Sequence, residues 1–290
     1  MTVSLTHAFV SGKTDGADST LVQPSNWNAN HTITMAQGNI LGRAAGAGTG
    51  AVSEIPLSFD ASNNATFPAG VIHAAGTTTI APASFQSGTN LTTAAAGSVE
   101  YDGKKLMFTP QGTQRGVVPG MQFYMLNSSV AGNNATGAQS LLGLSNGVTL
   151  SGSTIYAFEL FVVLVKTAGT TTHTVSTLFG GTATLNSILY DVRVNDVPNA
   201  VNTYGASANQ QGVTSNQASA TVTTGNLTTA ASYWSAVIKG IVSVNAGGTF
   251  HPQYSLSAAP GGAYTAQAGS YMLIYPIGAS GSNVNVGTWA

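Results

Sequence analysis

The chain has 290 residues and no cysteine, and its formal net charge is −1 with only 6% charged residues. Ordinary globular chains carry about 25% charged residues. Lys and Arg are therefore too few to line a phosphate-binding surface, and we expect no nucleic-acid partner. The lack of cysteine excludes disulfide scaffolds, thiol nucleophiles and zinc sites that need thiolates.

Membrane insertion is not expected either. The longest apolar stretch, Ile155–Val165, is about half the length of a membrane span, and it contains Glu159. The first residues do not combine a basic region with a following apolar region, so we expect no Sec-type leader.

The composition favours an all-β fold. Glycine, threonine and valine suit strands joined by tight turns, whereas Leu, Glu, Lys and Arg at helical spacing are missing. A surface with so few charges has little electrostatic protection against association. We therefore expect copies of the chain, or partners, to cover much of that surface.

Residues 1–36 contain the turn signals Asp15-Gly16 and Pro24-Ser25-Asn26 but too few apolar side chains for a core. Leu21, Val22 and Trp27 are therefore expected to lie against a partner's surface.

Residues 37–118 form a Gly- and Ala-rich segment of short apolar pieces, which cannot build a core from one chain. Equivalent strands from three chains can build one, which predicts an intertwined β shaft. Within it, residues 98–108 predict a hairpin that turns at Asp102-Gly103.

Residues 119–290 predict a denser β domain, a sandwich or jelly roll. The expected strands are 121–127, 139–150, 153–166, 172–179, 183–194, 219–224, 233–245, 249–257, 270–277 and 282–289.

The strand over 155–166 is apolar on both faces, whereas a strand in an open antiparallel sheet normally has one wet face. We expect one face to pack on the sandwich core and the other on a neighbouring subunit. Phe161, Val163 and Val165 are the predicted interface residues.

Catalytic chemistry is weakly supported. The carboxylate pairs are Asp15/Asp18, Glu100/Asp102 and Asp191/Asp196. Glycosidases use two carboxylates, so a small glycan depolymerase is the alternative of another class. Lys104 and Lys105 favour an ion-paired rim beside the second pair, and the histidines lack metal-ligand spacing. We expect no enzyme activity, no cofactor and no metal.

Two tyrosines, Tyr204 and Tyr264, are expected in or near loops, where aromatic rings stack on the apolar faces of sugars. They are the predicted receptor contacts.

Several blocks resemble virion proteins of tailed bacteriophages, in the group of tail fibres, head fibres and decoration proteins. LTHAFVSGKTDGADSTLVQPSNWNANHTI followed by ILGRAAGAGTGAVSEI is similar to the opening of many such fibres. LTTAAAGSVEYDGKKLMFTPQGTQRGVV resembles a recurring shaft hairpin, and FHPQYSLSAAPGGAYTAQAGSYMLIYPIGASG with STLFGGTAT resembles knobs of jelly-roll type.

The resemblance implies a homotrimer that is assembled in the host cytoplasm and located in the virion. Residues 1–36 would be the attachment arm, binding a tail, baseplate or capsid protein. The virion-binding residues would be Leu21, Val22, Pro24, Trp27 and His31. Residues 37–118 would form the shaft, and 119–290 a knob that adsorbs to a host-surface glycan or protein. A capsid head fibre or decoration protein of the same fold remains the alternative.

Overall fold

The computed structural model describes most of the chain after residue 74 and shorter pieces before it. The described residues are 2–5, 12–18, 20, 23–25, 31–34, 40–42, 53–55, 58–59, 65–66, 71–73, 75–145, 147–198, 209–222 and 230–287. Their regular structure is almost entirely antiparallel β-strand, which confirms the predicted all-β class. Across these ranges, no helix is long and apolar enough to cross a membrane.

The chain divides into two compact units, Met1–Ser84 and Phe85–Ala290. The first contains antiparallel pairs of short strands. They join β1 (Thr2–Leu5) to β2 (His31–Thr34), β3 (Ile40–Gly42) to β4 (Ser53–Ile55), and β5 (Ser58–Phe59) to β6 (Ala65–Thr66). Isolated two-stranded hairpins are marginally stable in water. Where burial is described in this unit, as over residues 12–18 and 75–84, the residues are exposed.

The second unit begins with a three-stranded sheet, which lies within the residues predicted to form the shaft. It consists of β7 (Val99–Tyr101), β8 (Leu106–Phe108) and β9 (Gly116–Val118) in that order. The hairpin predicted over 98–108 is confirmed. Gly103 adopts a φ of 85° in its turn, a left-handed conformation that glycine reaches without the penalty of a Cβ.

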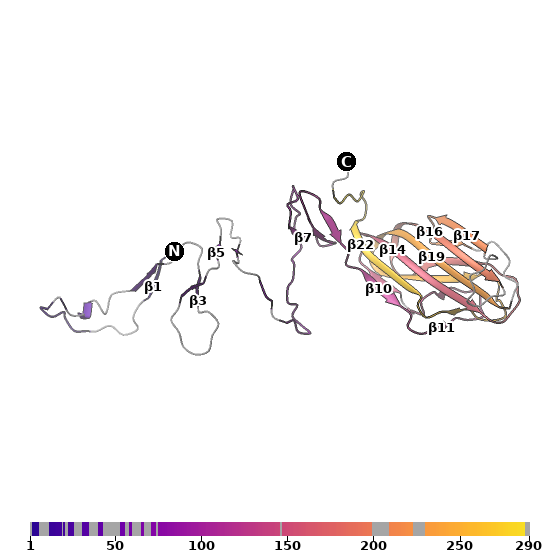
Figure 1. The fold of residues 1–290 in the computed structure, drawn as a ribbon, viewed down its shortest axis with the longest axis horizontal. Helices are drawn as coiled ribbons and strands as arrows, with labels where there is room; N and C mark the ends of the chain where they lie inside the picture. The colour runs from indigo at the N-terminus through magenta and orange to yellow at the C-terminus, as the bar shows by residue number, and fades with distance from the viewer. Residues whose placement is uncertain are drawn as a thin grey trace. The chain divides into compact units, whose positions relative to one another are not determined.

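The rest of the unit is built from two larger sheets (Figure 1). The first is eight-stranded, and its main path joins neighbouring strands that are far apart in the sequence. In order, this path is β10 (Gln122–Met125), β22 (Tyr271–Ala279), β14 (Thr154–Lys166), β19 (Ser232–Ala246), β16 (Thr184–Pro198) and β17 (Asn209–Ser215). The short strands β11 (Val130–Ala131) and β21 (Thr265–Ala266) pair with each other, and β21 also pairs with β14.

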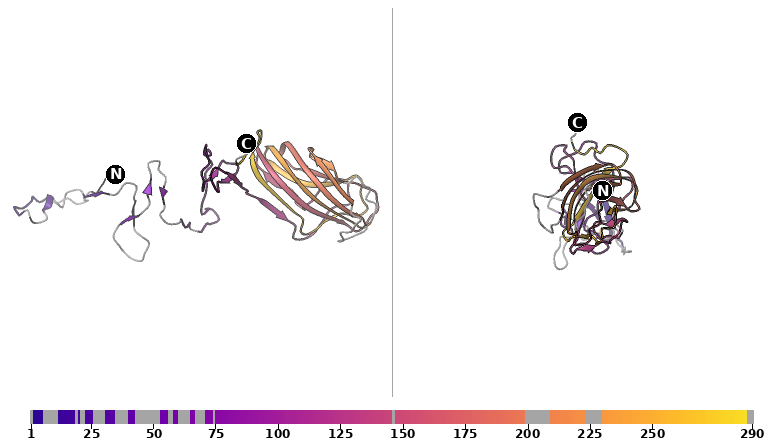
Figure 2. Two further views of the ribbon diagram at one scale, coloured as in Figure 1. Left: turned by 45° about the horizontal axis from the view of Figure 1, so that its top comes forward. Right: turned by 90° about the vertical axis from the view of Figure 1, so that its right-hand side faces the viewer.

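The second large sheet is five-stranded. Its path is β12 (Gln139–Ser140), β20 (Gly248–Leu256), β15 (Val175–Gly180) and β18 (Ser219–Thr221), and β13 (Val148–Leu150) also pairs with β20. The long strands of the eight-stranded sheet run side by side and curve together (Figure 2).

The inner faces of these two sheets share one hydrophobic core. Phe158 of β14 contacts Phe179 of β15 edge to face, with ring centroids 5.3 Å apart. Phe179 in turn stacks on Phe250 of β20 at 5.0 Å. The alternating pattern of β14 and β15 explains this packing, because every second side chain of each strand points inward.

Some predicted strands differ from the observed ones. The single strand expected over 139–150 is two short strands, β12 and β13, with residues 141–147 between them. Residues 282–287 are not in a strand, although 282–289 was predicted as one. Strand β17 was not predicted, because its polar sequence NQQGVTS lacks a strand pattern and depends on pairing with the edge of β16.

Candidate interaction surface

The two faces of β14 have different environments. Inward residues such as Phe158, Leu160 and Val162 are almost completely buried in the shared core. On the outer face, Ala157, Glu159 and Phe161 are only half-buried. One apolar face of this strand therefore packs within the chain, and part of the other remains at the surface of the eight-stranded sheet.

The three predicted interface residues do not share one environment. Phe161 keeps part of its surface and lies near Tyr271 of β22, with ring centroids 5.9 Å apart. Val163 and Val165 are only 8% and 7% exposed. Residues of their own chain lie beside them: the Val163 N–H donates to the Ser270 hydroxyl, and Thr265 pairs with Val165. These two valines leave little surface for a partner. Of the three predicted interface residues, Phe161 has the most side-chain surface left for one.

Exposed apolar side chains continue across the outer face on both sides of β14. Phe123 on β10 is 58% exposed and Leu189 on β16 is 56% exposed. Met125 and Ile241, on β10 and β19, are also exposed. Phe123 stacks on Tyr271 at 5.6 Å, which continues the aromatic contact of Tyr271 with Phe161.

Charged side chains lie in the middle of this face. Glu159 and Lys239 occupy paired positions on β14 and β19, and their side chains are 2.9 Å apart. The next position across is Asp191 of β16, which bonds Arg193 at 2.6 Å. The Tyr271 hydroxyl donates to Glu159 at 3.1 Å.

These contacts fix the charged states of the groups. The hydrogen bond from Lys239 lowers the pKa of Glu159, and the same bond raises the pKa of Lys239. The Arg193 guanidinium likewise lowers the pKa of Asp191. Both pairs are therefore fully ionised at neutral pH.

An apolar groove of about 370 Å³ lies beneath β10, beside this surface. Its lining includes Tyr124, Leu142, Val148, Pro252 and Met272. The lining is mostly apolar, and Gln122 and Thr149 are among its polar members.

Of the two predicted receptor contacts, the structure describes Tyr264. Tyr204 lies outside the described residues. Tyr264 is completely buried, and its hydroxyl bonds His173 at 2.8 Å. The prediction that Tyr264 contacts a receptor is therefore wrong for this fold, because its ring is part of the core.

Most predicted residues of the N-terminal arm lie outside the described part of the chain, namely Leu21, Val22 and Trp27. Pro24 is half-buried. His31 begins β2, where its backbone pairs with Leu5.

The carboxylates of the predicted pairs have structural partners. Asp15 accepts hydrogen bonds from the backbone N–H and hydroxyl of Ser25, and Asp18 accepts from both groups of Thr20. The Asp196 side chain is not among the described ones. Over the ranges given above, no three His, Asp or Glu side chains converge as a metal site would require.

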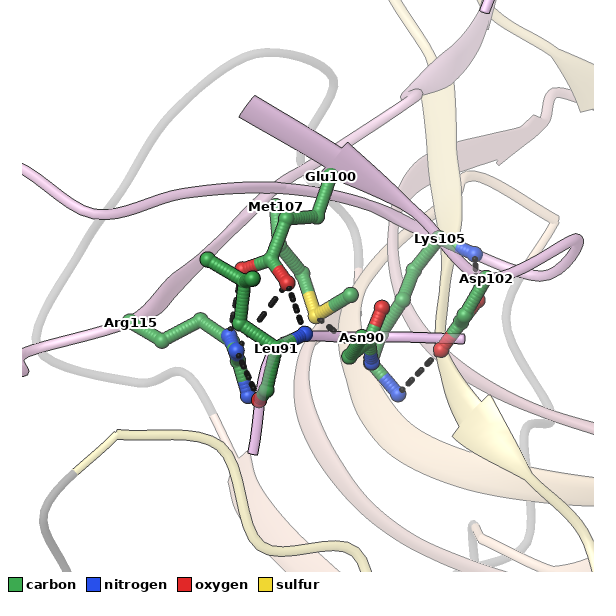
Figure 3. Close-up of polar contacts among 7 residues, drawn as sticks. All are labelled: Asn90, Leu91, Glu100, Asp102, Lys105, Met107 and Arg115. Carbon is green, nitrogen blue, oxygen red and sulfur yellow. Dashed lines mark hydrogen bonds and ion pairs between the residues drawn. The ribbon is translucent and has the colours of Figure 1, made fainter. Parts of the chain in front are cut away.

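Glu100 and Asp102 bond cationic side chains that lie beside the strands of the three-stranded sheet (Figure 3). Nε and Nη2 of Arg115 donate hydrogen bonds to the Glu100 carboxylate at 2.8 and 3.0 Å. Nη2 also donates to the Leu91 carbonyl oxygen at 2.8 Å. Asp102 bonds Lys105, which confirms part of the expected ion-paired rim. The Arg115–Glu100 contact was not predicted, because Glu100 lies on β7 and Arg115, 15 positions later, lies just before β9.

Comparison of the chain with protein-family models gave no match. Searches of curated proteins and of solved structures gave no match either.

Proposed function

We propose that this chain is a structural protein of a tailed-bacteriophage particle. It acts as a homotrimeric fibre without catalytic activity. Residues 1–36 attach it to the particle, residues 37–118 intertwine as a shaft, and the jelly-roll-like knob that follows adsorbs to the host surface. The blocks of sequence that resemble phage fibres are the origin of this proposal.

The observation that carries the proposal is the outer face of the eight-stranded sheet. It leaves large apolar side chains such as Phe123 and Leu189 in contact with solvent. Large exposed apolar patches mark surfaces that bind other proteins. A component that is assembled from several copies supplies such a partner.

The first unit supports the same proposal. Its described strand pairs are short, and Ile72 and Ile80 are largely exposed. Such a segment gains stability when equivalent segments of other chains pack against it.

The proposed mechanism is mechanical and multivalent. Three knobs on one stalk, and several stalks on one particle, turn weak individual contacts into lasting adhesion because the later contacts form at high effective concentration. This mechanism needs no reacting group, which agrees with the structural roles of Glu100, Asp102 and Asp191.

The experiment is a cryo-EM reconstruction of the intact particle, with the chain located and its copies counted. Trimers at the tail or baseplate support the adsorption fibre. Trimers on the capsid lattice support the alternative, a head fibre or decoration protein. A particle without this chain overturns both.

A second arm tests the attachment segment. Deletion of residues 1–36 should leave a trimer that no longer joins the particle. Incorporation of the truncated chain at the normal level would show that attachment lies elsewhere.

A further inference from the structure

We infer that the outer face of the eight-stranded sheet is the surface on which copies of this chain associate, and that its ion pairs set their register. The inference rests on the proposed function in one respect, since it takes the chain to work as several copies. The copies would meet on this face, which is not identified by locating the chain in the particle.

The charges of the chain after Val118 are distributed unequally over its surface. They are Glu159, Lys166, Asp191, Arg193, Asp196 and Lys239. Lys166 is buried, whereas Glu159, Lys239, Asp191 and Arg193 all lie on the outer face of the eight-stranded sheet. In the described residues of the five-stranded sheet, the outward positions are uncharged, as Ser176 and Gln253 illustrate. The two sheets therefore present different surfaces, and only one combines charge with large apolar groups.

The signs on this face suit a second copy of the same face. Glu159, Lys239 and Asp191 are neighbours across β14, β19 and β16, so negative, positive and negative charges follow one another. Arg193 adds a second positive charge, so the charges of these four described side chains sum to zero. A neutral, alternating set can be matched by the same set on a neighbouring copy when the two sets are offset, as in the head-to-tail contacts of a trimer. A strongly basic or acidic partner would find equal numbers of unlike and like charges.

The size of the face is sufficient for a stable contact. Six strands spaced about 4.8 Å apart span about 24 Å, and the 13 residues of β14 extend about 40 Å. The face thus measures on the order of 1,000 Å², compared with the roughly 800 Å² that each partner contributes to a standard interface.

The composition of the face also fits an interface between proteins. Phe123, Tyr271 and Phe161 form a row of contacting rings across β10, β22 and β14. Aromatic residues, methionine and arginine are enriched at the centres of interfaces, where their burial from water contributes most to the free energy of binding. Met125 and Arg193 complete this set.

The first test measures self-association of the full chain by light scattering and analytical ultracentrifugation. Phe123→Asp places a carboxylate on the exposed row without disturbing the core. We expect its dissociation constant to rise by about tenfold or more, because the interface would bury an unpaired charge. Ser219→Asp is the matched control, since Ser219 is exposed on β18 of the other sheet, and it should associate like the wild type. Circular dichroism checks that both variants fold.

The second test addresses register. The double variant Glu159→Lys with Lys239→Glu exchanges the two charges and keeps their pairing within the chain. It should self-associate like the wild type, but differently tagged wild-type and exchanged chains should co-assemble several-fold less often than random mixing requires. Random mixing would overturn the role of the ion pairs.

These results separate the inference from the proposed function. A monomeric wild-type chain, or a Phe123→Asp variant that associates normally, overturns the inference even if particles carry the chain. Loss of association in Phe123→Asp supports it even if the chain is absent from particles, in which case the proposed function fails alone.

Discussion

His173 and Tyr264 are bonded to each other inside the second unit, with Nε2 of the imidazole 2.8 Å from the phenolic oxygen and both side chains almost completely buried. The other ring nitrogen, Nδ1, lies 2.7 Å from the Thr171 carbonyl oxygen. A carbonyl oxygen only accepts, so Nδ1 carries the hydrogen of the neutral ring. Nε2 then accepts a hydrogen bond from Tyr264, and the site fits a neutral imidazole.

This arrangement predicts that the protein loses stability in mild acid. Burial lowers the pKa of His173, and the positive charge of Lys166 lowers it further, against the opposing effect of the Thr171 carbonyl. Burial also lowers the pKa of His251. Since an unfolded histidine titrates near a pKa of about 6.5, the unfolded chain binds protons first as the pH falls. The stabilisation is therefore present above about pH 6.5 and is lost as the pH decreases toward the folded-state pKa values.

The check is the urea midpoint of unfolding at pH 7.5 and at pH 5.0. The midpoint should be lower at pH 5.0. His173→Gln, which cannot titrate there, should show a smaller decrease than the wild type. An equal decrease in the two proteins would remove His173 from the explanation.

Tyr264→Phe tests the other half of the contact. The variant keeps the ring but removes the hydroxyl, so the buried Nε2 of His173 loses its donor. An unsatisfied buried acceptor costs about 1–3 kcal/mol, and the free energy of unfolding at pH 7.5 should decrease by that amount. Tyr124→Phe is the control, because Tyr124 on β10 is 41% exposed. If both variants unfold like the wild type, the bond contributes no stability.

Local patterns in the sequence predicted the features that depend on neighbouring residues. The Asp102-Gly103 turn was predicted because its residue types suit a tight hairpin, and the structure confirms it. The two-sided apolar pattern of β14 predicted a strand with an inner face in the core, which is also observed.

Features that depend on distant residues were not predictable in this way. Tyr264 follows Gly261-Gly262-Ala263 and therefore fits a loop pattern, but its ring is buried and its hydroxyl bonds His173, 91 positions earlier. The row of Glu159, Lys239 and Asp191 likewise depends on the strand order β14-β19-β16. No local spacing encodes that order.

We expect even a very small side chain at Gly240 to lower the stability of the fold. It lies on β19 between Phe158 and Tyr190 of the neighbouring strands. An added Cβ would lie 2.5 Å from the Leu189 carbonyl oxygen and 2.9 Å from the Phe158 ring. Overpacking of this kind costs about 1–3 kcal/mol, so Gly240→Ala should lower the thermal midpoint clearly. Gly137→Ala, where nothing lies within 4 Å, should leave it nearly unchanged, and equal midpoints for the two variants would contradict the packing argument.

We expect substitution of Arg115 to change stability locally, around Leu91, rather than in the whole fold. Its guanidinium joins Glu100 to the Leu91 carbonyl, while the Leu91 N–H donates to Glu100 at 2.7 Å (Figure 3). Lysine keeps the charge but lacks the planar fork that makes these contacts together. In Arg115→Lys, hydrogen exchange at the Leu91 amide should therefore be about tenfold faster, with the thermal midpoint of the two large sheets almost unchanged. Gln114→Ala, an exposed neighbour, should leave that exchange rate as it is. Unchanged exchange in Arg115→Lys would show that the segment before β7 is held by packing, for which the buried Met107 is the candidate.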